Sequence, residues 1–283
     1  MEFLLLSGMI SFGVVQNVLK KEYGRKTDGG GVYLFSGILT LVSSLFFIVI
    51  SGFKLDITAE MLIYALLLST AYFFGVIFSH LALLTGPLSI TSLVNSFAMI
   101  IPMAVGIIFY NEPLTLTLAL GFTALAISLV LINAQKSEEK LSLKWLIYVV
   151  FAFFGNGMFS VILSLCQRRL GGGIDNQIMA ISMFISAVVI LGISLIKERK
   201  EIKTAFRHGW HRATATGALN GGANLCSLLL MRIMNISLMS PISSGGAVVL
   251  SSLVGVFVYK ERLLVSQYVG IVFGTLAVIL MSL

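Results

Sequence analysis

The chain has 283 residues, of which 58% are hydrophobic and only 11% are charged, and its formal net charge is +7. A mean hydropathy of +1.01 leaves too few polar groups to cover a surface in water. The composition therefore excludes a soluble globular protein and favours an integral membrane protein. Basic loops that face an anionic cytoplasmic leaflet account for the positive charge without a nucleic-acid partner.

Ten apolar segments follow one another along the chain. Each is a continuous run of about 20 residues, the length of a membrane-spanning helix, whereas barrel strands alternate in polarity over about 10 residues. The sequence therefore predicts an all-α integral membrane protein with ten transmembrane helices. The predicted spans are residues 2–19, 32–51, 60–84, 88–110, 114–133, 144–169, 175–196, 211–235, 237–259 and 264–282.

The two halves of the chain match without a gap when one is shifted by 149 residues. The matched pairs include Gly8 with Gly157, Tyr110 with Tyr259, Glu112 with Glu261, and Gly121 with Gly270. We predict a first five-helix repeat over residues 1–135, a linker over 136–143 and a second five-helix repeat over 144–283. Because five is an odd number of crossings, the second repeat is inverted in the membrane relative to the first. Inverted repeats open a central site to each side in turn, so solute transport is the leading interpretation.

Charge predicts the orientation. Ten spans place both termini on one side of the membrane, and the basic residues divide unequally between the two sides. The side of the termini holds Lys54, Arg168, Arg169 and Arg232. The opposite side holds Lys20, Lys21, Arg25, Lys26, Lys136, Lys140, Lys144, Lys197, Arg199, Lys200, Lys203, Arg207, Arg212, Lys260 and Arg262. The positive-inside rule then places both termini outside, in a multi-pass protein of a prokaryotic inner or plasma membrane. Residues 197–212 alternate basic and aromatic side chains, and we expect them to form a short helix on the lipid surface. A surface anchor is favoured over a partner-binding site.

Amide side chains stand out inside the predicted spans, where an amide is costly unless it finds a partner. Asn220 and Asn224 are four residues apart and share one helix face. The candidate substrate-binding residues are Asn95, Asn156, Asn220, Asn224, Ser244 and Tyr72. Asn95 is the repeat counterpart of Ser244, and Tyr72 offers a stacking surface. The alternative is that each amide only holds neighbouring helices together.

His80 is the one residue inside a span, away from its ends, that changes charge near neutral pH. It is our candidate for carrying a coupling proton. The alternative is that His80, about one turn from the end of its span, meets water or headgroups. Glu112, Glu261 and Arg232 end their spans, and an interfacial position or pairing with a nearby charge is favoured over gating.

The span interiors contain no Asp, Glu, Lys or Arg away from their ends, so nothing there would neutralise a multiply charged substrate. We therefore expect a small neutral, zwitterionic or amphipathic organic metabolite as the substrate. No enzyme constellation, cofactor site or metal site is predicted. Cys166 and Cys226 fall inside spans, where a thiol packs as a small apolar group, and His208 and His211 have no third ligand nearby.

Two short motifs point to a family. The sequences Tyr110-Asn-Glu112 and Tyr259-Lys-Glu261, which close the fourth and ninth spans, and the run Ala82–Ser89 resemble the drug/metabolite transporter superfamily, in particular its ten-helix EamA-like permeases. The resemblance covers the whole chain. It implies that spans 1, 3, 4, 6, 8 and 9 surround a central cavity and that spans 5 and 10 are peripheral. It also implies cytoplasmic termini, opposite to the charge count.

We therefore predict a secondary transporter, a permease or exporter, that works by alternating access. The alternative is a lipid-handling flippase or a non-transporting membrane subunit of the same fold. Gly270 and Gly274 form a small-residue face on the last span, for which packing within the chain is favoured over a dimer seam. Either a monomer or a homodimer is consistent with the sequence.

Overall fold

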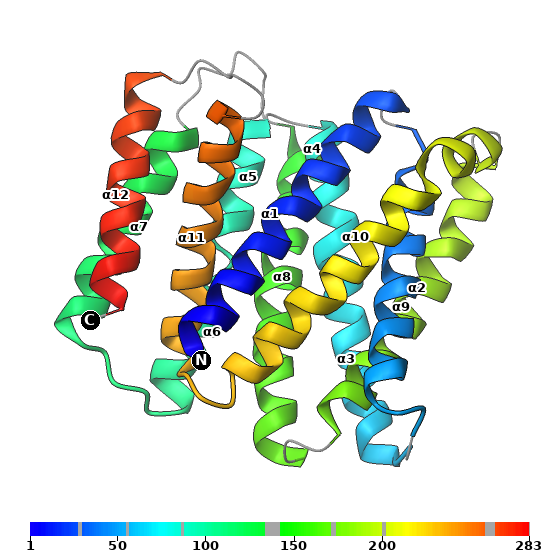
Figure 1. Cartoon of the computed structure of the whole chain (residues 1–283), viewed down its shortest axis with the longest axis horizontal. Helices are drawn as coiled ribbons and strands as arrows, with labels where there is room; N and C mark the ends of the chain where they lie inside the picture. The colour runs from blue at the N-terminus through cyan, green and yellow to red at the C-terminus, as the bar shows by residue number, and fades with distance from the viewer. Residues whose placement is uncertain are drawn as a thin grey trace. The chain divides into compact units, whose positions relative to one another are not determined.

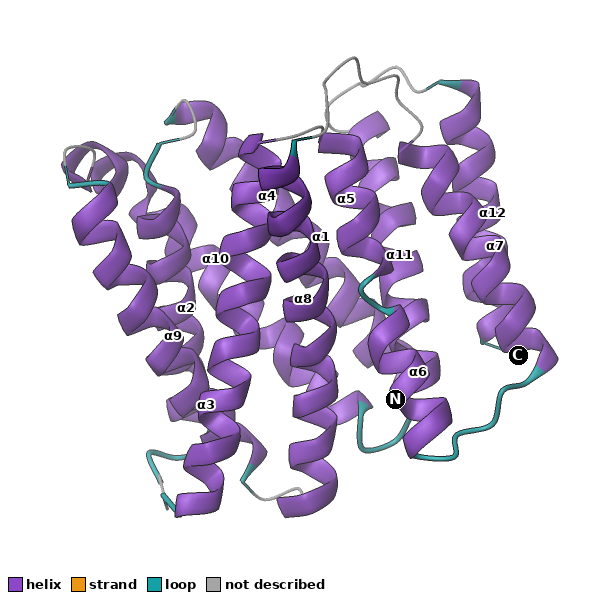
Figure 2. Cartoon of the chain, turned by 180° about the vertical axis from the view of Figure 1, so that it is seen from behind, coloured by secondary structure: helices purple, strands orange, loops and turns teal. Residues whose placement is uncertain are grey.

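The computed structural model describes residues 1–27, 30–54, 57–85, 88–133, 142–170, 174–199, 202–257 and 264–282. Every regular element among them is helical (Figure 2). In chain order these are α1 (Glu2–Lys26), α2 (Val32–Ile50), α3 (Ala59–Phe73), the π-helix η1 (Phe74–Phe78), α4 (Ser79–Thr85), α5 (Leu88–Phe97), α6 (Ile100–Phe109), α7 (Leu116–Asn133), α8 (Leu143–Leu170), α9 (Asp175–Lys197), α10 (Ile202–Leu230), α11 (Ile236–Phe257) and α12 (Val265–Met281). The all-helical expectation is confirmed for the described residues.

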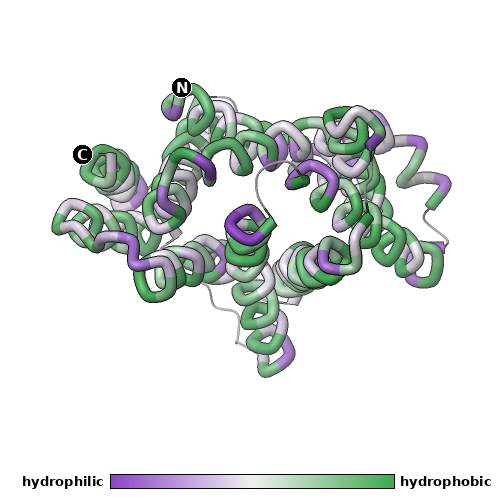
Figure 3. Tube along the Cα trace, turned by 90° about the horizontal axis from the view of Figure 1, so that it is seen from below, coloured by the Kyte–Doolittle hydropathy of each residue, from purple (hydrophilic) through white to green (hydrophobic). Residues whose placement is uncertain are grey.

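Many of these helices suit a membrane. Six stretches are long and apolar enough to cross one: Glu2–Gly24, Val32–Ile50, Ala59–Ala82, Leu143–Leu170, Asp175–Lys197 and Ile236–Phe257. Shorter apolar helices cover Leu93–Phe109, Leu116–Ile132 and Val265–Met281. In the view from below in Figure 3, much of the visible trace is green, which marks apolar residues. α10 is not among the six, because Asn220, Asn224 and several glycines lower its hydropathy.

The chain forms two compact units. Residues 3–73 and 162–232 make up the first unit, and residues 74–161 and 233–283 make up the second. Each unit therefore contains segments from both predicted repeats. Most of the predicted linker, up to residue 141, lies outside the described residues.

In the first unit, α2 and α9 lie side by side (Figure 1). They run antiparallel, because Gly37 contacts Leu191 while Ser44 Oγ, further along α2, donates to Ala180 O at 2.8 Å. A Cβ on Gly37 would lie 2.5 Å from Leu191 Cδ2, so the close approach requires glycine. Small residues of this kind allow helices to pack tightly in lipid.

α1 and α10 also contact each other along the first unit. A Cβ on Gly8 would lie 3.4 Å from Cys226 Sγ, and one on Gly222 would lie 3.1 Å from the Phe12 ring. These contacts run in opposite directions along the two helices, so α1 crosses α10 in an antiparallel sense. Residues 202–212 are the first turns of this continuous α10, so they do not form the separate short helix expected over 197–212. Ile202 to Leu230 contains no proline that would break the helix.

In the second unit, α7 and α12 lie side by side (Figure 1). Ser128 Oγ donates to Gly270 O at 2.6 Å, and Gln267 Nε2 donates to Ile132 O at 3.0 Å. A Cβ on Gly274 would lie 2.7 Å from Ser128 Oγ. Gly270 and Gly274 therefore pack within the chain, against α7.

Candidate functional site

Four polar side chains from three helices meet in the first unit. Asn224 Nδ2 donates to Asn220 Oδ1 at 3.0 Å and to Asn220 O at 2.9 Å. Ser43 Oγ of α2 lies 3.1 Å from Asn220 Oδ1, and Asn220 Nδ2 donates to Gln16 Oε1 of α1 at 3.2 Å. We call Gln16, Ser43, Asn220 and Asn224 the α10 amide network. Asn220 is its centre, because it bonds to each of the other three.

Glycines on α10 bring α2 close enough to form this network. A Cβ on Gly217 would lie 2.6 Å from Leu39 O, and one on Gly221 would lie 2.6 Å from the Phe46 ring. The Gly217 carbonyl also accepts a hydrogen bond from Ser43 Oγ at 2.9 Å. The glycines thus allow a backbone approach that places Ser43 beside Asn220.

The two asparagines of the network differ from Gln16 in their exposure. Gln16 is buried, with 5% of its surface exposed, whereas Asn220 and Asn224 are only part-buried. Both asparagines lie in α10, which is not among the stretches apolar enough to cross a membrane, and an accessible amide that faced lipid would be costly. Their accessibility therefore favours a polar path along this face of α10.

Tyr72 of α3 lies in the same unit. Its Oη is 3.5 Å from Thr40 Oγ1, a long hydrogen bond, and Thr40 is one turn before Ser43 on α2. Thr40 Oγ1 also donates to Ser36 O at 2.7 Å. The structure therefore gathers Asn220, Asn224 and Tyr72 around α2.

Asn156 of α8 belongs to the second unit and lies against the π-helix. Its Nδ2 donates to Ser79 Oγ at 3.2 Å, and a Cβ on Gly75 would lie 2.5 Å from Asn156 Oδ1. Gly155 contacts the backbone of Gly75 as well. Single π-helical turns inside α-helices are frequent at functional sites, and here the turn accommodates Asn156.

Asn95 lies beside an interruption of the fourth span. α5 ends at Phe97 and α6 begins at Ile100, and Ala98 N donates to Asn95 O at 3.2 Å. Asn95 Oδ1 is buried without a hydrogen-bond partner among the described residues. An unpaired buried acceptor typically costs about 1–3 kcal/mol, so Asn95 is a position where a donor group of a ligand would be stabilised.

Ser244 and His80 complete the predicted set. Ser244 is part-buried on α11, three residues after Pro241. Within the part of the chain that the structure describes, Asn95, Ser244 and Asn156 do not bond to one another. His80 is part-buried in the first turn of α4, next to Ser79. It therefore follows directly the residue that Asn156 binds.

Charged groups lie at helix ends. Arg232 Nη2 donates to Asp175 Oδ2 at 2.7 Å, which agrees with the expected pairing. Gln167 Nε2 donates to the same oxygen at 3.2 Å and to Leu228 O at 2.7 Å. These bonds tie α8, the start of α9 and the end of α10 together.

Glu112 has a capping role that the sequence did not indicate. Its Oε2 accepts a hydrogen bond from Ser237 N at 2.9 Å, and the side chain is 7% exposed. It therefore caps the N-terminus of α11, where the helix dipole favours a carboxylate. Its repeat counterpart Glu261 lies outside the described residues.

Sequence reasoning counted Gln16 among the amides inside spans but not among the candidate substrate-binding residues, and it gave no role to Ser43, Thr40 or Ser79. The implied cavity-lining spans excluded the second span and directed attention away from Ser43 and Thr40. A signal existed, because Ser36, Thr40 and Ser43 recur at helical spacing and so place a polar stripe on one face of α2.

Comparisons with known proteins agree on the fold. The model of the EamA-like transporter family matches residues 143–283. A solved chain described only as "Crystal structure of protein" has a TM-score of 0.81 and 14% sequence identity, over 99% of this chain and 95% of that chain. At this identity the likeness shows the fold alone. The search for similar curated proteins found no match.

Proposed function

The chain belongs to the EamA-like transporter family of the drug/metabolite transporter superfamily, and from this premise we propose that it moves a small neutral, zwitterionic or amphipathic organic metabolite across the cell membrane by alternating access. The observation that carries the proposal is the accessible pair Asn220 and Asn224 in the α10 amide network. These amides offer hydrogen bonds to a polar solute inside a membrane span.

The packing of α7 and α12 supports an inverted repeat. Gly121 packs against Met281, and Gly270 packs against Ile132. The shift of 149 residues converts Gly121 into Gly270 and Ile132 into Met281, so one contact is made twice, in opposite directions. Two equivalent helices that run antiparallel are what an odd number of crossings per repeat produces.

The chemistry of the named groups supports the substrate class. The amides, Ser43 and Tyr72 donate and accept hydrogen bonds but carry no charge. Asp175 and Arg232, which pair with each other, lie at helix ends. A buried, multiply charged solute needs opposite charges to replace its hydration. An uncharged or internally balanced solute needs only hydrogen bonds and apolar contact.

The test begins with a ligand. Purified protein is screened by thermal shift against uncharged, zwitterionic and anionic metabolites, and the best ligand is followed by uptake into proteoliposomes. Asn224→Ala removes a hydrogen-bonding partner and should weaken affinity roughly ten- to a hundredfold. Asn17→Ala is the matched control, because Asn17 is an exposed amide on α1 next to Gln16, and it should leave affinity unchanged.

Wild-type affinity and uptake in Asn224→Ala would show that the network only packs helices. Stabilisation by multiply charged anions alone would overturn the substrate class. Movement of a labelled phospholipid between leaflets, with no solute uptake, would identify a flippase instead.

We also propose that His80 carries a coupling proton and that both termini lie on the outer side of the membrane. His80 is a titratable group in the segment that Asn156 contacts through Ser79. The excess of basic residues on the side opposite to the termini supports the orientation, and a prokaryotic plasma membrane is the proposed location.

A further inference from the structure

The first three turns of α10 have one face packed inside the protein. Tyr23 Oη donates to Gly31 O at 2.8 Å, and Gly31 lies so close that its Cβ would contact Ala205. A Cβ on Gly209 would meet the Tyr23 ring, and Ala213 is buried in the same cluster as Tyr23. The start of α10 is therefore held against the hairpin of α1 and α2.

The opposite face of these turns points away from the protein. Phe206, Arg207 and Trp210 lie three, four and seven residues after Lys203, so the four residues share one side of the helix. Phe206 is 51% exposed and Trp210 is 50% exposed, and both basic residues are exposed as well. We call these four residues the basic–aromatic face.

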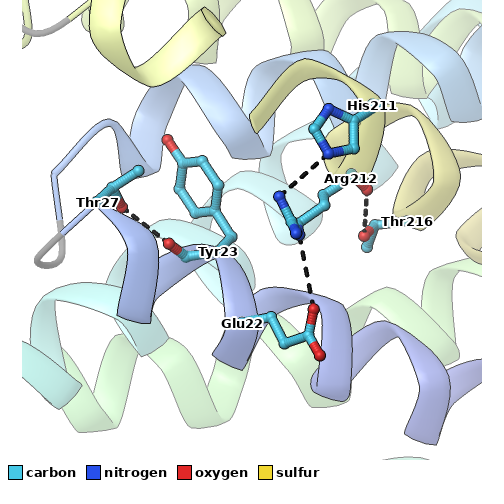
Figure 4. A network of polar contacts seen from close by, with 6 residues as sticks. All are labelled: Glu22, Tyr23, Thr27, His211, Arg212 and Thr216. Atoms are coloured by element: carbon cyan, nitrogen blue, oxygen red, sulfur yellow. Dashed lines mark hydrogen bonds and ion pairs between the residues drawn. The ribbon is translucent and has the colours of Figure 1, made fainter. Parts of the chain in front are cut away.

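Among the described residues, the acidic groups near these turns are engaged elsewhere, which leaves this face positive. Arg212 Nε lies 3.6 Å from Glu22 Oε2, and His211 Nε2 lies 3.1 Å from Arg212 Nη1 (Figure 4). The carboxylate of Glu198 accepts hydrogen bonds from the first backbone N–H groups of α2. The two described carboxylates around this end of α10 are thus bound to other groups than Lys203 and Arg207.

We propose that the basic–aromatic face binds the headgroup region of an anionic phospholipid. No charged residue follows Arg212 within α10, which favours a position of this face at the boundary between membrane and water. Trp and Phe are stable at this boundary, and nearby Lys and Arg attract anionic headgroups. The packing of Ala205 and Gly209 holds this part of the helix in place and presents the four side chains together. Little backbone freedom is therefore lost on binding.

Fluorescence quenching tests this assignment, because the chain has two tryptophans, Trp145 and Trp210. Trp145 is 4% exposed and donates Nε1 to Thr91 Oγ1 at 2.9 Å, so Trp210 is the accessible one. The protein is reconstituted in phosphatidylcholine bilayers that contain equal small fractions of brominated phosphatidylglycerol or brominated phosphatidylcholine. The difference between wild type and Trp210→Phe isolates the quenching of Trp210.

In wild type, the brominated anionic lipid should quench Trp210 more strongly, with a preference of roughly fivefold for each basic side chain. The double variant Lys203→Gln/Arg207→Gln should lose this preference but keep quenching by brominated phosphatidylcholine. The control Lys54→Gln/Arg169→Gln removes the same charge from exposed positions elsewhere and should keep the preference.

Equal quenching by the two lipids in wild type would overturn the proposal, and so would a preference that survives in Lys203→Gln/Arg207→Gln. Absence of quenching by either lipid would place the face outside the bilayer boundary and would likewise overturn the proposal. Because quenching needs no transport substrate, its result is independent of the proposed transport function.

Discussion

Glu198 caps α2 through Leu34: its Oε2 accepts a hydrogen bond from Leu34 N at 2.9 Å, although the two residues are 164 positions apart. The other oxygen accepts a hydrogen bond from Tyr33 N at 2.9 Å, and Ser194 Oγ lies 3.0 Å from Oε2. The side chain is 9% exposed. A carboxylate from the end of α9 thus satisfies the first N–H groups of α2 and joins the two helices where their antiparallel packing begins.

Removing this cap should destabilise the protein. Glu198→Ala leaves two backbone donors near the start of α2 without their acceptor, at a cost of about 1–3 kcal/mol. Thermal unfolding in detergent should show a clearly lower Tm. Glu60→Ala, at an exposed position in the first turn of α3, is the control and should change the Tm little. An unchanged Tm in Glu198→Ala would mean that water replaces the carboxylate at no cost.

The glycine face of α12 should be needed for folding within one chain. Leucine at both Gly270 and Gly274 would clash with Ile132 and Ser128, so the Tm should fall while the particle mass stays the same. Gly192→Leu is the control, since no atom lies within 4 Å of a Cβ there. Light scattering measures the mass, and a mass that halves would show that the face joins two copies.

Orientation can be tested by cysteine labelling. In a variant that lacks Cys166 and Cys226, a cysteine at Arg207 should resist a membrane-impermeant thiol reagent in intact cells, whereas one at Lys54 should react. The physical reason is that basic segments remain on the cytoplasmic side during insertion. Labelling at position 207 and protection at position 54 would establish cytoplasmic termini. Permeabilised cells, in which both cysteines should react, are the control.

Asn156 should contribute to substrate binding more than its partner does. Asn156→Ala removes an accessible amide beside η1 and should weaken affinity roughly ten- to a hundredfold. Ser79→Ala removes only the acceptor of the 3.2 Å hydrogen bond and should have a smaller effect. Isothermal titration with the identified ligand measures both. Equal affinities in wild type and Asn156→Ala would assign Asn156 to helix packing.

Replacement of His80 should separate binding from coupling. His80→Gln keeps a polar side chain of similar size but cannot gain a proton, so ligand affinity should be retained. Uptake driven by an imposed pH gradient should be lost. His211→Gln, at an exposed position on α10, is the control and should keep the response. A normal response to the gradient in His80→Gln would remove the histidine from the coupling step.

Local properties of the chain were enough to predict most of the helices and one contact of the α10 amide network. The hydropathy of a segment determines whether it is stable in lipid. The assignment to membrane proteins and the approximate positions of the helices therefore follow from the hydropathy profile along the sequence. Helix geometry places residues four apart on one face, which is why the pairing of Asn220 with Asn224 was predictable. The polar stripe of α2 was equally present in the sequence.

Only the tertiary structure decided which distant groups meet. Asn220 bonds to Ser43 and Gln16, which are 177 and 204 residues away. No local pattern in the sequence distinguishes these pairs of residues from other distant pairs. The π-helix at Phe74–Phe78 exists beside Asn156 because packing overrides the backbone preference of an apolar segment. An apolar helix face is as stable against lipid as against another helix, so hydropathy does not determine which helices pack together. The selection comes from small residues, such as Gly37 and Gly217, and from polar groups that must find one another.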